Sequence, residues 1–250
     1  MAQSVEAVAD ARELLRDRTI AVRRRSHWFY VGITLALIVI VVVGFWPSYF
    51  GTLVSGGVTR PWVMQLHGAV FTGWMALLLF QVSLAATGRV RLHRQVGRVG
   101  IAYGGLVLVL GLIVSFTAPV MHVRAGEWTV ERAAGFLLLP LVDMILFAGF
   151  FGTAVAYRHK TDVHKRLMLA ATVALAFAAV SRMNLPPLQF ALVWLAPMAA
   201  AMIFDLTSAG RVHVVNVMST AVLAVAFVRI FFLESPAWLA VARPMLQLFL

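Results

Sequence analysis

The chain contains no cysteine and few charged residues. None of its 250 residues is Cys, and Asp, Glu, Lys and Arg together make up 12%. The absence of thiols excludes a disulfide framework, a thiolate zinc site and a cysteine-ligated iron–sulfur cluster. Any metal chemistry must therefore use His, Met or carboxylate side chains. The sequence also lacks a glycine-rich phosphate loop, an HExxH motif and a Gly-x-Ser-x-Gly elbow, which excludes the enzyme classes that these motifs mark.

Hydrophobic residues make up 62% of the chain, well above the roughly 45–50% of a water-soluble domain. Most of this apolar surface must face lipid. The formal net charge of +11 comes from Lys and Arg residues that cluster in short segments between apolar runs, and not along one polar face. We interpret these clusters as topology signals and as anchors for anionic membrane lipids, and we expect no nucleic-acid partner.

Seven apolar runs follow a charged N-terminal segment, and each is long enough to cross about 30 Å of hydrocarbon as a helix. The sequence therefore predicts an all-α fold, a polytopic bundle of seven transmembrane helices. Residues 1–27 are expected to form an amphipathic basic segment on the cytoplasmic surface or, alternatively, a disordered tail. The transmembrane domain then covers residues 28–233, and residues 234–250 form a short C-terminal tail. The expected spans are residues 28–46, 62–87, 97–120, 133–157, 163–182, 186–205 and 212–233.

Basic residues in the connecting segments predict the orientation, because Lys and Arg are retained on the cytoplasmic side. The N-terminal segment and the second and fourth loops are rich in them, whereas the alternate loops are poorer or carry compensating Glu. We therefore expect a cytoplasmic N-terminus and, after seven crossings, a C-terminus outside. No small-residue cleavage pattern follows the first apolar run, so no cleaved signal peptide is expected. The expected location is a bacterial inner membrane.

Histidine is the residue type most informative about function, because it ligates haem iron and carries protons near neutral pH. His93 and His164 stand at the start of the third and fifth spans, beside Arg94 and Lys165. Two imidazoles at one depth on different helices can clamp an iron porphyrin, and adjacent cations can neutralise propionates or bind a quinone headgroup. These residues are therefore candidates for a haem b site. The alternative is a pair of interfacial histidines satisfied by water and lipid phosphate.

Two polar residues lie deeper in the predicted spans. His67, near the outer end of the second span, must bond within the bundle, either structurally or as a ligand or proton carrier. Asp143, near the middle of the fourth span, must be paired or protonated, which makes it a candidate for proton relay or for a structural bond. The partners considered for Asp143 are Gln81, Ser115, Thr172 and Asn216.

Other residues indicate architecture. Pro140 predicts a kink in the fourth span. Arg182 is expected to snorkel to the outer surface, and Asp205 and Arg211 are expected to be cytoplasmic loop charges. Small residues on the third span predict a face that permits close helix packing: Gly100, Gly104, Gly105 and Gly111.

Two motifs carry a resemblance. Residues 66–100 read LHGAVFTGWMALLLFQVSLAATGRVRLHRQVGRVG, and residues 162–175 read DVHKRLMLAATVAL. The chain resembles an uncharacterised bacterial family of multi-pass membrane proteins with LH, LHRxxGR and HKRLM motifs, over most of residues 28–182. It is more distantly similar to transmembrane b-type cytochromes and haem-copper oxidase assembly proteins. That similarity implies His67, His93 and His164 as ligand candidates, although a second, outer pair is missing.

The leading hypothesis is a haem-binding, redox-associated protein that exchanges electrons with quinone near the cytoplasmic face. The second is a non-catalytic accessory or structural subunit of a larger membrane complex, which would have other subunits as partners. The third is a small transporter that uses Asp143 and His67 in proton coupling; it lacks the paired broken helices typical of such proteins.

Overall fold

The computed structural model describes residues 25–56 and 61–250, and these residues contain helices and no strand. Seven helical segments among them are long and apolar enough to cross a membrane, which confirms the predicted all-α bundle of seven spans. The predicted surface helix falls almost wholly on residues 1–24, outside the described residues. The seven spans are Arg25–Ser55, Trp62–Ala86, Val90–Arg124, Val130–Ala156, Thr161–Met183, Pro187–Ala209 and Val214–Phe231.

The first span is longer than predicted. Its helix continues past residue 46 through a π-helical turn, η1 (Trp46–Phe50), and a short helix, α2 (Gly51–Ser55). Pro47 stands at the start of that turn and has no backbone N–H to donate to the preceding turn, which accounts for the change in helical pitch.

The second and third spans are α3 (Trp62–Ala86) and α4 (Val90–Arg124), which pack against each other. The fourth span is divided into α5 (Val130–Phe136) and α6 (Leu138–Ala156) at Leu137. Pro140 cannot donate a hydrogen bond to the carbonyl one turn earlier, and the interruption occurs in that turn, as predicted.

Helix α7 (Thr161–Val180) is the centre of the bundle. Of its most apolar stretch, 67% lies inside the protein, against 22–33% for the other six spans. It contacts α6, α8 (Pro187–Ala209) and α9 (Val214–Phe227). Its many alanines let neighbours approach closely: a side chain at Gly44 of the first helix would clash with the backbone of Ala179. A short 3-10 helix, η3 (Val228–Phe231), extends the seventh span beyond α9.

The glycines of α4 differ in whether helix packing requires them. A side chain at Gly104 would clash with the Phe151 ring, and one at Gly111 would clash with the Met144 sulfur, both on α6. These contacts confirm the predicted close packing at the two positions. Gly105 has no neighbour within 4 Å of an added Cβ, so its small size is not needed for helix packing.

The predicted C-terminal tail contains a further helix, α10 (Pro236–Gln247), whose first turn is capped by Ser235. It packs against α5, and its Ala242 and Leu246 are buried in a small apolar cluster with Val120, Ala133 and Ala134. Residues 234–250 are therefore attached to the bundle.

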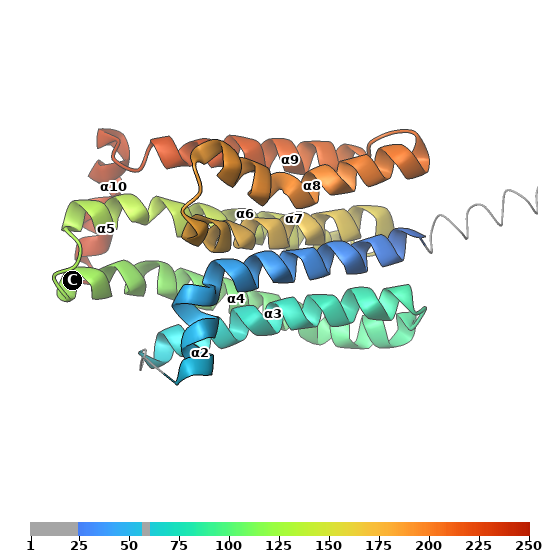
Figure 1. The fold of residues 1–250 in the computed structure, drawn as a ribbon, viewed down its shortest axis with the longest axis horizontal. Coiled ribbons are helices and arrows are strands. Elements are labelled where there is room, and N and C mark those ends of the chain that lie inside the picture. The colour runs from blue at the N-terminus through green and yellow to red at the C-terminus, as the bar shows by residue number, and fades with distance from the viewer. Residues whose placement is uncertain (1–24, 57–60) are drawn as a thin grey trace, which may run out of the picture.

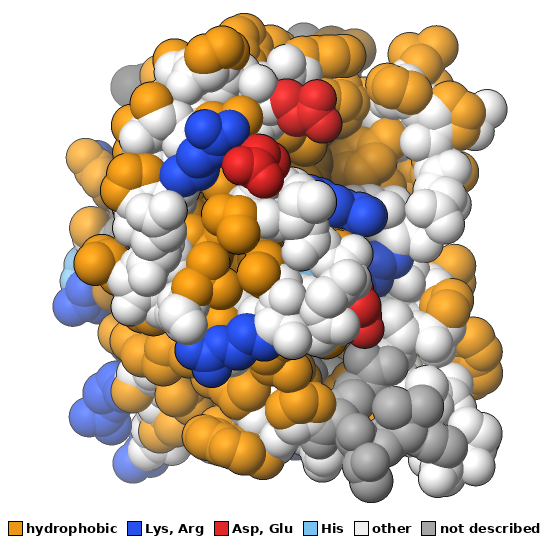
Figure 2. All heavy atoms as spheres, turned by 90° about the vertical axis from the view of Figure 1, so that its left-hand side faces the viewer, with side chains coloured by type: hydrophobic (Ala, Val, Ile, Leu, Met, Phe, Trp, Pro, Cys, Tyr) orange, Lys and Arg blue, Asp and Glu red, His pale blue; other side chains and the backbone are white. Residues whose placement is uncertain are grey.

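The helices alternate in direction (Figure 1). The start of the first helix, the α3–α4 turn, the α6–α7 turn and the α8–α9 connection lie together at one end of the bundle, called here the basic end. The α10 helix, α5 and the C-terminus lie at the opposite end. Viewed from that opposite end, Figure 2 shows a few acidic and basic side chains among a largely apolar surface. The arrangement matches the predicted alternation of loops.

Candidate functional site

His93 and His164 line the same cavity near the basic end. The cavity has a volume of about 170 Å³ and lies between the first helix, α3, α4, α6 and α7; we call it the His93 cavity. His93 comes from the first turn of α4 and His164 from the first turn of α7. Helix α6 packs against both of these helices. His27 of the first helix lines the cavity as well.

Each of the two imidazoles is held by a backbone carbonyl. His164 Nδ1 lies 2.8 Å from the carbonyl oxygen of Ala154, and His93 Nδ1 lies 3.2 Å from that of Gln81. A carbonyl oxygen can only accept, so Nδ1 of His164 carries the proton and its Nε2 keeps the lone pair, and the Gln81 backbone carbonyl favours the same tautomer of His93. Histidines that ligate metals are commonly oriented in this way.

Gln81 contacts His93 twice. With its amide nitrogen facing the ring, the Gln81 side chain also lies 2.6 Å from His93 Nδ1, and its oxygen then accepts from Gly97 N at 2.9 Å. In that arrangement Nδ1 is the acceptor and Nε2 carries the proton. Gln81 therefore controls which His93 nitrogen is free to bind a ligand.

Glycines form part of the wall of the His93 cavity. Gly97 and Gly100 both line it, and an added Cβ at either position would lie no closer than 3.6 Å to a neighbouring side chain. Helix packing therefore does not require glycine at Gly100, contrary to the prediction that all four glycines serve close packing. The missing side chains instead keep the α4 side of the cavity open and flat.

The basic residues next to the two histidines differ in position. Lys165 lines the cavity, where its Nζ lies 2.6 Å from Asp162 and donates to Ser26 Oγ at 2.9 Å. Arg94 is exposed and lies outside the cavity lining. Of the predicted flanking cations, Lys165 alone is thus placed where it can reach a ligand in this cavity.

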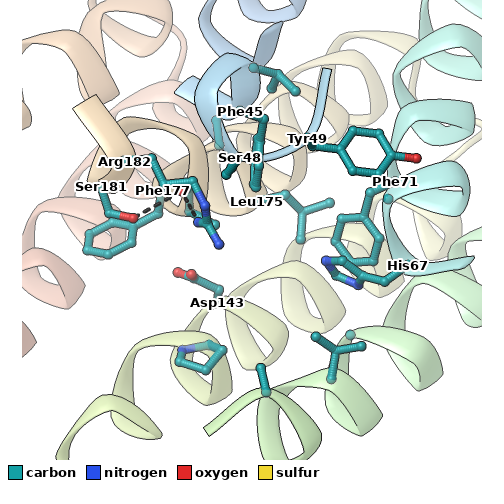
Figure 3. A pocket seen from close by; sticks show the side chains of 18 of the residues that line it. Phe45, Ser48, Tyr49, His67, Phe71, Asp143, Leu175, Phe177, Ser181 and Arg182 are labelled. Carbon is teal, nitrogen blue, oxygen red and sulfur yellow. Dashed lines mark hydrogen bonds between the residues drawn. The ribbon is translucent and has the colours of Figure 1, made fainter. Parts of the chain in front are cut away.

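His67 and Asp143 line a second, larger cavity of about 250 Å³, called here the His67 cavity. It lies nearer the opposite end, between the first helix, α3, α4, α6 and α7. Figure 3 shows His67 on one side and Asp143 and Arg182 on the other, with Leu175 between them. The structure therefore brings His93 and His164 together and places His67 apart from both.

Asp143 pairs with Arg229 of η3, a residue that the sequence analysis did not consider. Both side chains are almost fully buried, with exposed fractions of 6% and 5%. The Arg229 guanidinium also lies 4.0 Å from the centre of the Phe177 ring. An arginine within an apolar span is costly without a counter-ion, and that cost is the sequence signal that could have identified the partner.

A second buried ion pair lies at the basic end. Arg166 donates through Nε and Nη2 to the Asp205 carboxylate, which also accepts from Asn216 and from the backbone N–H of His213. Asp205 has an exposed fraction of 3%. The prediction that Asp205 is a loop charge was wrong, because this carboxylate joins α7, α8 and α9.

Arg182 is exposed at the far end of α7, as its predicted snorkelling requires. Its Nη1 donates to the carbonyl of Ala178 at 2.6 Å, and its guanidinium lies 4.4 Å from the centre of the Phe45 ring. It stands at the rim of the His67 cavity (Figure 3).

No known protein family, curated protein or solved structure matches this chain. Across residues 25–56 and 61–250, no group of three or more His, Cys, Asp or Glu side chains could hold a metal ion. The fold and the two cavities define an integral membrane protein with two separate sets of polar groups inside its bundle.

Proposed function

We propose that this integral membrane protein binds haem b in the His93 cavity, where His93 and His164 would hold the iron, in a bacterial inner membrane. The observation that carries the proposal is the pair of imidazoles on separate helices that line one cavity, each with Nδ1 at a backbone carbonyl. This bonding leaves Nε2 of His164 as the ligating atom, and Nε2 of His93 is free to ligate when the Gln81 amide does not donate to Nδ1.

The residues around the pair suit a porphyrin. Gly97 and Gly100 provide a flat wall, and Lys165, whose ammonium pairs with Asp162, belongs to the lining and offers a cation for a propionate. A haem iron held by two histidines takes only two ligands from the protein. The lack of a group of three or more metal-binding side chains in the described residues therefore does not count against this site. Bound haem would supply a one-electron carrier, which supports a role in quinone-linked electron transfer.

The test is optical. Detergent-purified protein titrated with haemin should give a Soret band and, on reduction, the sharp visible bands of six-coordinate haem. His93→Ala and His164→Ala should each weaken binding or change the coordination, and the double variant should lose it. His159→Ala is the matched control, because His159 is an exposed histidine at the same end.

Absence of a Soret band after haemin addition, or equal binding by the double variant, would contradict the proposal. The accessory-subunit hypothesis then becomes the better one, and it predicts stable co-purification with partner subunits. Circular dichroism should accompany each titration, so that lost binding is separated from lost folding.

A further inference from the structure

The His67 cavity has polar groups at two opposite ends and apolar walls between them. His67 stands on the α3 side and Asp143 on the α6 side, with the Asp143 carboxylate directed away from His67 (Figure 3). Leu175 lies between these ends, Phe71 lies beside His67, and Phe177 lies beyond Arg182 on the Asp143 side. A ligand that forms hydrogen bonds with both His67 and Asp143 must therefore carry polar groups at both ends of an apolar body.

Two polar atoms of the cavity lining have no protein partner in the described part of the chain. His67 Nδ1 and Ser48 Oγ are both buried and unbonded. Buried polar atoms normally have a hydrogen-bond partner, and each one left unmet costs about 1–3 kcal/mol. The His67 ring packs against Phe71, with centroids 4.1 Å apart, so its position is defined before any ligand enters.

The opposite end offers an acceptor. Asp143 Oδ1 takes the hydrogen bond from Arg229, which leaves Oδ2 as an acceptor. Arg229 compensates the Asp143 charge, and the other charged side chain of the lining, Arg182, is exposed at the rim. A neutral ligand fits this interior better than an ion, whose desolvation would not be repaid there.

We infer that the His67 cavity binds the ring of a membrane-soluble para-quinol. Its two hydroxyl groups lie at opposite ends of a flat ring, so one can donate to Asp143 Oδ2 and the other can bond to His67 Nδ1. The ring body contacts the aromatic and aliphatic walls. An ionised carboxylate cannot donate, so the oxidised quinone loses the bond at the Asp143 end and binds more weakly.

This inference deepens the quinone link of the proposed function, but it rests on different residues. Decylubiquinol and decylubiquinone are suitable probes for purified haem-free protein in nanodiscs, with binding followed by the quenching of tryptophan fluorescence. Trp74 lines both cavities, so quenching that His67→Leu reduces is the part that reports occupancy of the His67 cavity. We expect saturable binding, with the quinol at least about tenfold tighter than the quinone, as the loss of one buried hydrogen bond implies.

Variants distinguish the site from nonspecific partitioning. His67→Leu and the double variant Asp143→Leu/Arg229→Leu should each weaken quinol binding about tenfold; the double variant removes the carboxylate without leaving a buried cation. The matched control is His122→Leu, because the His122 side chain is 43% exposed and pairs with Glu127 outside the cavity. It should bind quinol as the parent does.

Three results would overturn the inference: no saturable quinol binding, unchanged affinity in the His67 and Asp143 variants, or tighter binding of benzoate than of quinol, which would indicate an anion site. Two variants distinguish failure of the haem proposal from failure of the quinol inference. His93→Ala/His164→Ala should lose the Soret band and keep quinol binding, whereas His67→Leu should lose quinol binding and keep the Soret band.

Discussion

Replacing Asp143 by leucine should strongly destabilise the bundle, because the change leaves the Arg229 guanidinium buried without its counter-charge. Arg229 already has two nitrogens, Nε and Nη1, with no partner in the described structure. Its remaining favourable contact is with the Phe177 ring. Breaking a buried pair by removing one partner costs about 3–5 kcal/mol, and the exposed fractions of 6% and 5% place this pair in that class.

The double variant Asp143→Leu/Arg229→Leu should recover much of this loss. Two apolar side chains need no desolvation, and such replacement of a buried pair is often neutral or stabilising. The double variant should therefore be more stable than either single variant. This outcome is the opposite of additivity, which holds for residues that do not interact.

The assay is equilibrium unfolding in mixed detergent micelles, followed by circular dichroism and tryptophan fluorescence. The control is Arg243→Leu, which breaks a pair 3.6 Å apart whose side chains are 46% and 60% exposed. Exposed pairs contribute about 0–1 kcal/mol, so this variant should change little. The reasoning is refuted if the double variant loses as much stability as the two single variants together.

Three further outcomes are expected. Gly100→Phe should abolish haemin binding without unfolding the protein, because the new ring fills the His93 cavity. Gly105→Phe should leave haemin binding unchanged, because Gly105 faces open space. Equal Soret bands in the two variants would contradict this. Asp205→Ala should cost about 3–5 kcal/mol in the same unfolding assay, because it removes the buried counter-ion of Arg166 and leaves the exposed Asp162 carboxylate, 3.4 Å away, as its counter-charge. Asp162→Ala, whose side chain is 70% exposed, should cost less than about 1 kcal/mol.

The last of the three concerns pH. Burial, followed by the nearby Arg166 charge, lowers the pKa of His213, whose Nδ1 accepts a hydrogen bond from Val215 N at the start of α9. The unfolded chain then takes up the proton more readily than the folded protein, so acidification below about pH 6.5 should lower stability. His213→Asn keeps a capping acceptor and should flatten this dependence; an unchanged slope would contradict it.

The sequence by itself determined the number, order and approximate bounds of the seven spans, because a run of about 20 apolar residues has one stable state in lipid, a helix. Local rules also predicted the interruption near Pro140, where a missing N–H acts within a single turn. The side of the membrane that each end faces stays a prediction from the basic loops, and fusion reporters would test it.

Tertiary structure alone decided which polar residues meet. Asp143 and Arg229 are 86 residues apart in the chain, and Arg166 and Asp205 are 39 apart. Hydropathy describes each helix separately, whereas these contacts depend on the rotation of one helix against another. The same rotation puts His93 and His164 into one cavity and His67 into a different one. A residue's identity sets the chemistry available to it, but its partner is selected by the packing of helices that are distant in sequence.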